Sequence, residues 1–415
     1  MRISLNDQRV WYAVLGLSVT LRVAIAPFTG HPYDVGIWMM TGGYVVAGLS
    51  PYLLHPHIGY PPLWALWCGV AYLVSNFISR GNPFAYIFVI KIPILIADFV
   101  LALMLLVVSK KLPYSGQATG RVLAAWFLLN PYVLIVGVVW GMMDNLVAVL
   151  LIASIILVAT KPAWSGVSAS LAVALKLYPI LFLPVMLVYV ASTRKLTHIA
   201  EWVLAFLVTS LVTIWLPFVL FRWDVAGFIG VGLSQVGREP GGIAPMATIP
   251  YLANVGLTSV GPISLQDIIN APSLRLIWIP ALIMCVLFII WKRPRFVSIP
   301  TIILGCSLLY LTYLLTASWI SEQLFELVLI LMLFFAAFGG LRRFSYRTYA
   351  VGSAIVLLFL AFNVPLTSFV FPLYLIDRTL LADFGKSFLP WLALIFGCYL
   401  ITEIVITAET LTQTD

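Results

Sequence analysis

Charged residues are scarce in this chain. Only 9% of its 415 residues are Asp, Glu, Lys or Arg, whereas 62% are hydrophobic and the mean hydropathy is +1.08. A water-soluble domain needs more charge than this, so the composition excludes one and indicates a chain whose surroundings are mostly lipid. No stretch is both polar and long enough to form a separate soluble domain. We therefore predict an all-α, polytopic membrane protein with a single domain over residues 1–415.

Cysteine is also sparse. The four cysteines are scattered through apolar runs, without the spacing of a metal site or of a disulfide framework; they are Cys68, Cys285, Cys306 and Cys398. Because free cysteine is readily buried as a small apolar side chain, we predict that all four are packing residues.

The basic residues are grouped between the apolar runs. The groups are Lys110 and Lys111; Arg194 and Lys195; Lys292, Arg293 and Arg295; and Arg342, Arg343 and Arg347. With Arg2, Arg9, Arg121 and Lys161 they make up fourteen of the 23 basic residues. Such groups mark cytoplasmic loops, so the net charge of +8 reflects membrane orientation rather than nucleic-acid binding. This pattern places both chain ends in the cytoplasm.

The apolar runs predict about 11 to 13 spans at about 20 residues each. We expect helices near 10–28, 85–108, 121–138, 145–160, 165–178, 179–192, 197–221, 271–291, 297–316, 323–340, 347–365 and 388–407. The first of these is a retained span rather than a cleaved signal. Residues 61–79 form a re-entrant or tilted helix or, alternatively, an ordinary span. External loops cover 29–60, which contains an interfacial helix, and 223–270. The helices 165–178 and 179–192 are both short and are separated at Pro179.

Ionisable residues gather on the external side of this topology. They are Asp34, Asp144, Lys176, Arg238, Glu239 and Glu322. Charges at membrane depth are costly, so a cluster on one face predicts a functional site. Simpler roles stay open for five of them: helix capping for the two aspartates, snorkelling for the lysine and solvation in the loop for Arg238 and Glu239. Asp98, on the same helix face as Lys91, is expected in a structural network between helices.

An acid beside cations at a membrane surface suits glycosyl transfer from a lipid-linked phosphosugar. The carboxylate takes a proton from the acceptor hydroxyl. The cations stabilise the departing phosphate, and a groove between helices would hold the polyprenyl tail.

The segment DVGIWMMTGGYVVAGLSPYLLHPHIGYPPLWALW resembles the first external loop of the C-type integral-membrane glycosyltransferases (GT-C). Three later segments agree in order: Leu129-Asn130-Pro131 ahead of Trp140-Gly141-Met142-Met143-Asp144, then Lys176-Leu177-Tyr178-Pro179, then Ser321-Glu322-Gln323-Leu324-Phe325. These anchors reach across residues 34–326. Within the superfamily, the chain looks most like the first mannosyltransferase of GPI-anchor synthesis and its prokaryotic relatives.

This resemblance implies an inverting transfer of mannose, or another hexose, from a polyprenyl (dolichyl) phosphate donor to a lipid-linked glycan or glycolipid. Asp34 takes the position of the catalytic base; the donor phosphate and sugar fall to Lys176, Tyr178, Arg238 and Asp144; and acceptor or supporting roles fall to Glu239, Glu322, Gln323, Tyr60 and His57. The relatives carry two acids in this loop where this chain has one, so we predict no divalent metal and no cofactor. The active site would face the non-cytoplasmic side of a prokaryotic plasma membrane or of the endoplasmic reticulum.

Two readings from other classes stay open. A transporter or flippase of a lipid-linked sugar would show inverted repeats and charges near the midplane; the sequence shows no repeat, although the break from Lys176 to Pro179 suits such a protein. A non-catalytic subunit of a glycan assembly complex would tolerate the loss of Asp34.

Overall fold

Helices form nearly all of the structure. The computed structural model describes residues 7–54, 59–110, 116–193, 196–236, 238–247, 271–292, 298–339 and 342–363, with shorter pieces between 249 and 267 and between 369 and 402. Half of the expected span 388–407 lies outside the described residues. The same holds, for the residue or for its side chain, for His57 and for the basic residues Arg2, Lys111, Arg194, Lys195, Arg293, Arg295, Arg342, Arg343 and Arg347.

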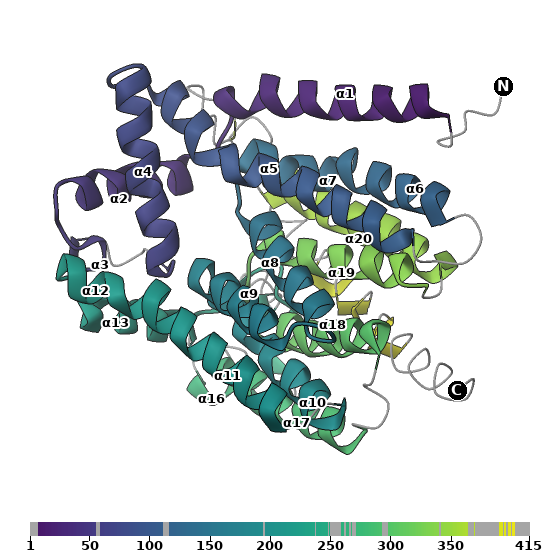
Figure 1. Ribbon diagram of the computed structural model, residues 1–415. Coiled ribbons are helices and arrows are strands. Elements are labelled where there is room, and N and C mark those ends of the chain that lie inside the picture. Colours follow the sequence, from purple (N-terminus) through teal and green to yellow (C-terminus); the bar gives the residue numbers. More distant parts are fainter. Residues whose placement is uncertain are drawn as a thin grey trace.

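The N-terminal half runs from the first helix to the break before α10 (Figure 1). Its elements are α1 (Gln8–Ile25), η1 (Ala26–Phe28), α2 (Pro32–Val46), α3 (Pro51–Leu54), α4 (Pro62–Ile78), α5 (Pro83–Ser109), α6 (Gly116–Leu128), α7 (Pro131–Val133), η2 (Leu134–Trp140), α8 (Asp144–Leu157), α9 (Pro162–Leu175) and η3 (Tyr178–Phe182).

The C-terminal half adds more helices and four two-residue strands. Its elements are α10 (Leu183–Thr193), α11 (Leu196–Ser210), η4 (Leu211–Trp215), α12 (Leu216–Phe221), α13 (Val225–Val236), β1 (Gly241–Gly242), η5 (Pro245–Ala247), β2 (Ser259–Val260), β3 (Ile263–Ser264), α16 (Pro272–Arg275), α17 (Trp278–Trp291), α18 (Ile299–Thr316), β4 (Trp319–Ile320), η7 (Glu322–Leu324), α19 (Phe325–Ala337) and α20 (Arg342–Asn363). β1 pairs with β4 in parallel, and β2 pairs with β3 antiparallel.

Among the described residues, four helical stretches are long and apolar enough to cross a membrane: Gln8–Phe28, Pro83–Ser109, Leu196–Phe221 and Ile299–Thr316. The pair Thr119–Leu128 and Pro131–Trp140, bent by 46°, makes a fifth if it is one span. The predicted fold class, a polytopic helical membrane protein, is confirmed. Several other predicted segments are apolar helices of 10–17 residues, shorter than the roughly 20 residues of a straight crossing, so the expected 11 to 13 crossings stay a prediction.

Helix α4 forms a corner with α2. Figure 1 shows α4 running across the direction of α1 rather than beside it. The two helices pack so closely that a side chain at Gly42 would meet the backbone carbonyl of Cys68, and one at Gly69 would meet Val45. The orientation suits a tilted or re-entrant helix, although the crossing of 61–79 stays a prediction. Cys68, Cys285 and Cys306 are buried as predicted, but Cys398 is exposed.

A buried ion pair links α1 to α5. Arg22 Nε lies 2.7 Å from Asp98 Oδ2, and both side chains are almost fully buried. Arg22 also donates to the carbonyl oxygen of Leu128 at 3.0 Å, while Asn145 Nδ2 donates to Asp98 Oδ1 at 2.6 Å. Charges at this depth need partners, so Asp98 lies in the network between helices that the sequence predicts.

Lys91 of α5 has a different environment. Its fully buried ammonium donates to the carbonyl oxygens of Ala26, Thr29 and Val138 at 3.1, 2.6 and 2.6 Å. Carbonyls at the end of a helix lack partners within it, and a cation there is favourable. Lys91 therefore holds the ends of η1 and η2 together.

We expect Arg22→Met to lower the free energy of unfolding by about 3–5 kcal/mol, because it leaves the Asp98 charge buried and unpaired. The double variant Arg22→Met/Asp98→Leu should recover most of this loss. Unfolding in mixed micelles measures both, with the exposed Arg80→Met as control. If the double variant is as unstable as the sum of the two single variants, the pair is not energetically coupled.

Candidate functional site

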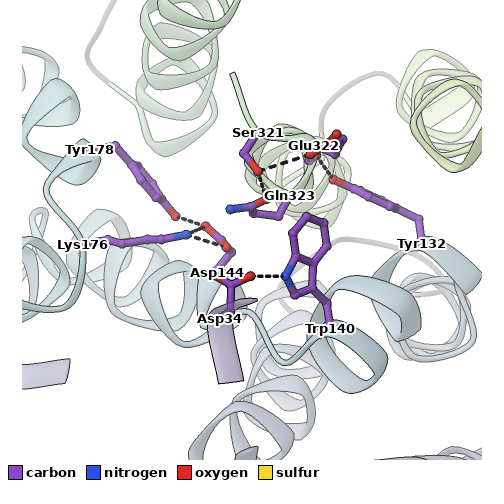
Figure 2. Close-up of polar contacts among 9 residues, drawn as sticks. All are labelled: Asp34, Tyr132, Trp140, Asp144, Lys176, Tyr178, Ser321, Glu322 and Gln323. Carbon is purple, nitrogen blue, oxygen red and sulfur yellow. Dashed lines mark hydrogen bonds and ion pairs between the residues drawn. The ribbon is translucent and has the colours of Figure 1, made fainter. Parts of the chain in front are cut away.

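Three side chains meet at the start of α8. Lys176 Nζ donates to both carboxylate oxygens of Asp144, at 2.9 and 2.8 Å, and the Tyr178 hydroxyl donates to Asp144 Oδ1 at 3.0 Å (Figure 2). Asp144 is 1% exposed and Lys176 is 8% exposed. The lysine ammonium also lies 5.6 Å from the centre of the Tyr178 ring. The sequence-predicted residues Asp144, Lys176 and Tyr178 therefore form one closed, charge-balanced group.

Two helix breaks place this group. η2 ends at Gly141, whose φ of 91° lies in the left-handed region, which glycine adopts without strain. A Cβ there would lie 2.7 Å from Lys91 Cε. On the other side α9 ends at Leu175 and Lys176 is extended, with φ −146° and ψ 145°. The break therefore comes at Lys176, before the 3₁₀ helix that contains Pro179, and not at Pro179 as the sequence pattern predicts.

Asp34 lies in the first turn of α2. The N-cap of this helix is His31, so Asp34 is not a capping residue. Its Oδ2 accepts a hydrogen bond from Trp140 Nε1 at 2.8 Å and lies 2.9 Å from His31 Nδ1. Trp140 is the last residue of η2, four residues before Asp144, where α8 begins. The sequence motif contained Trp140, but only the structure gives it a role, as the partner of Asp34.

The segment between α18 and α19 lies beside this group (Figure 2). The Tyr132 hydroxyl donates to the backbone carbonyl oxygen of Glu322 at 2.7 Å. Ser321 Oγ donates to the side-chain oxygens of Gln323 and of Glu322. Glu322 and Gln323 are both nearly buried. The structure thus brings these two predicted residues to the cluster on a 3₁₀ turn, fixed by Tyr132 from α7.

Tyr60 lies in the electrostatic field of both aspartates. Burial raises the pKa of its hydroxyl well above the ordinary value, and the nearby carboxylates of Asp34 and Asp144 raise it further. Both aspartates therefore lie within electrostatic reach of one phenol. Asp34, Asp144, Lys176, Tyr178, Tyr60, Glu322 and Gln323 form what we call the polar cluster.

Arg238 and Glu239 diverge at the edge of this cluster. The Arg238 guanidinium lies 3.8 Å from the centre of the Trp319 ring, and Nη1 donates to Gln235 Oε1 at 3.0 Å. Glu239 has an 82% exposed side chain 3.8 Å from Arg275. Arg238 therefore packs against Trp319, three residues before Glu322, whereas Glu239 is largely exposed.

Glu326 is a further buried acid, which the sequence reading missed. It is fully buried, and neither carboxyl oxygen has a hydrogen-bond partner among the described residues; the same holds for Asn145 Oδ1. An isolated buried carboxylate is costly to keep ionised, so we expect this group to be a neutral acid. Its position as the one charged residue of the otherwise apolar helix α19 is the signal that could have indicated it.

No three His, Cys, Asp or Glu side chains gather as a metal site in the described part of the chain. The polar cluster offers hydrogen bonds and charges rather than a ready set of metal ligands.

Residues 58–230 match the family model of the GPI transamidase subunit PIG-U. The match covers less than half of the chain but includes Asp144, Lys176 and Tyr178. No curated protein matches the sequence significantly.

This finding corrects the resemblance to the GT-C mannosyltransferases. The segment that carries two of the motifs behind that resemblance is similar to a transamidase subunit, so the prediction of a mannosyltransferase, and of hexosyl transfer as the function, is wrong. The structure supplies a physical reason, because Lys176 is held by Asp144 rather than left for a donor phosphate. The expected link to membranes and to GPI anchors fits the match; the glycosyltransferase chemistry does not.

We expect Asp144→Asn to lower the free energy of unfolding by about 3–5 kcal/mol, because Lys176 then keeps a buried charge without a counter-charge. Glu326→Gln, also in the core, should change it by no more than about 1 kcal/mol, because one neutral group replaces another. Unfolding of the purified variants in mixed micelles measures both. An equally large loss for Glu326→Gln would mean that Glu326 is ionised.

Proposed function

We propose that this chain is a non-catalytic membrane subunit of a complex of the GPI transamidase type, which attaches GPI anchors to proteins. The similarity of residues 58–230 to the subunit PIG-U supports this proposal. The match begins just before α4 and takes in the break between α9 and α10, so it covers the elements that position Asp144, Lys176 and Tyr178.

The closed pair of Asp144 and Lys176 supports a non-catalytic role most directly. A cation that serves a reaction at phosphate must be free to meet developing charge. Here the Lys176 ammonium donates hydrogen bonds to both carboxylate oxygens of Asp144, and the Tyr178 hydroxyl donates a third to the same carboxylate. The arrangement supports a role in joining α8 to the break after α9. A rigid helical subunit needs such a joint, whereas a transporter of lipid-linked sugars would need this break to move.

The partners proposed for this chain are other subunits of such a complex and its glycolipid substrate. Its proposed place is the endoplasmic reticulum membrane, with both chain ends cytoplasmic, a single domain and the polar cluster on the lumenal side. Charge placement supports this orientation, because the basic groups fall between apolar segments on the opposite side.

Depletion of the chain from its own cells should abolish attachment of a GPI anchor to a secreted reporter protein and leave the unprocessed reporter behind. Mannosyl transfer from dolichyl phosphate mannose, assayed in the same membranes, should be unchanged. Re-expression of the wild-type chain is the control for the depletion. Normal anchor attachment in depleted cells, with the chain verifiably absent, would refute the proposal.

A further inference from the structure

A groove of about 480 Å³ runs between α1, the bent pair α6–α7 and α20. These helices lie side by side in Figure 1. The groove walls include Val14 of α1, Trp126 and Leu129 of the bent pair, and Ala350, Ala354 and Leu357 of α20. The two alanines are exposed and one helical turn apart, so their small side chains leave space along α20. None of the lining residues belongs to the polar cluster.

The groove has a mostly apolar lining because its polar side chains bond to one another or to backbone. Asn130 Nδ2 donates to Ser353 Oγ at 2.8 Å, and the Tyr349 hydroxyl donates to the carbonyl oxygen of Trp126 at 3.2 Å. Both bonds join residues that are 223 positions apart. Helices α6 and α20 therefore run in the same direction and in one register along the groove.

This register places basic residues of both helices at the same end of the groove. The first two residues of α20, Arg342 and Arg343, lie level with the start of α6, where Arg121 is about 6 Å before Ala125 along the helix. The end of α5 is also here, since a Cβ at Gly120 would lie 3.1 Å from Ser109 Cβ, and Lys110 follows. We call this the basic end of the groove; it consists of Lys110, Arg121, Arg342 and Arg343.

The segments that form the basic end carry no acidic residue. Neither 99–143 nor 327–376 contains an Asp or a Glu. At the start of α1, by contrast, Arg9 is accompanied by Asp7, which caps that helix. The basic end therefore has a positive charge that its own segments do not neutralise, directly beside an apolar groove. By the placement of positive charge, this end faces the cytoplasm.

We propose that the groove binds one acyl chain of an anionic phospholipid from the cytoplasmic leaflet, with the lipid phosphate at the basic end. Lys110 and Arg121 contact the head group, and the chain lies along Ala350 and Ala354 toward Leu357. This site goes beyond the proposed function and does not rest on it.

Charge and size together select this occupant. A basic pocket between membrane helices on the cytoplasmic side favours anionic over zwitterionic head groups, because each cation there attracts net negative charge. A partner helix fits less well. About ten residues of α-helix, about 10 Å across and about 15 Å long, fill roughly 1,200 Å³, whereas the groove has about 480 Å³. A single flexible hydrocarbon chain can enter a groove of this volume.

The test is photocrosslinking of the full chain in phosphatidylcholine nanodiscs. One probe is a phosphatidylserine and the other a phosphatidylcholine, each with a photoactivatable group in one acyl chain and each at the same mole fraction. Mass spectrometry locates the labelled peptides. The serine probe should label the α20 peptide that lines the groove at least fivefold more than the choline probe does.

The variants test the groove and the charge separately. Ala354→Leu fills the groove and should reduce this labelling at least fivefold, whereas Ala200→Leu, at an exposed alanine of α11, should not. Lys110→Gln/Arg121→Gln should bring the labelling by the two probes within twofold of each other. Lys110→Arg/Arg121→Lys should keep the preference, which separates charge from folding. Arg80→Gln, an exposed arginine at the opposite end of α5, should keep it as well.

Equal labelling by the two probes in the wild-type chain, or labelling that Ala354→Leu leaves unchanged, overturns the inference. The same probes are then added to membranes of the chain's own cells. Labelling that occurs in nanodiscs but not in those membranes assigns the groove to a partner's helix and also overturns it. Anchor attachment is not part of this readout, so a failure here leaves the proposed function standing.

Discussion

The cost of a charge in surroundings that are mostly lipid governs this structure. Each deeply buried cation described here has a partner that removes this cost: Asp98 for Arg22, Asp144 for Lys176, and a group of backbone carbonyls for Lys91. These partners lie on different helices, so satisfying the charge also fixes how the helices meet. The pairs therefore set the positions of α1, α5, α8 and α9 more specifically than apolar packing, which has little directional preference in lipid.

The same constraint explains why the polar cluster lies at breaks between helices. A break exposes backbone carbonyls and N–H groups that need partners, and the chain supplies them with charged side chains: Lys91 at the end of η2 and Lys176 after α9. Structural polar groups and candidate binding groups thus gather in one place. What separates them is pairing. The inner residues Asp144 and Lys176 balance each other's charge, whereas Asp34 and Arg238 are partly exposed.

Much of the fold could be predicted from the sequence, because apolar length and positive-inside charge report membrane helices directly. The convergence of Asp144, Lys176 and Glu322 was also predictable, since unusual charges on one face need each other. The pairing was not. Asp144 and Lys176 are 32 residues apart, and a lone acid at a helix start reads equally well as a base or as a counter-charge. Trp140 and Glu326 gave even less signal, because nothing in a sequence shows which indole reaches a carboxylate or which acid is left neutral.

The misleading resemblance has the same physical origin. Proline at a helix start, an acid in a first turn and a lysine before a proline are what a broken membrane helix requires, whatever the protein does. A catalytic reading of Lys176 would require its ammonium to leave Asp144 and meet a phosphate, and the carboxylate would then stay buried without a counter-charge, at a cost of about 3–5 kcal/mol. The paired centre is therefore expected to hold the break between α9 and α10 in place rather than to meet a phosphate.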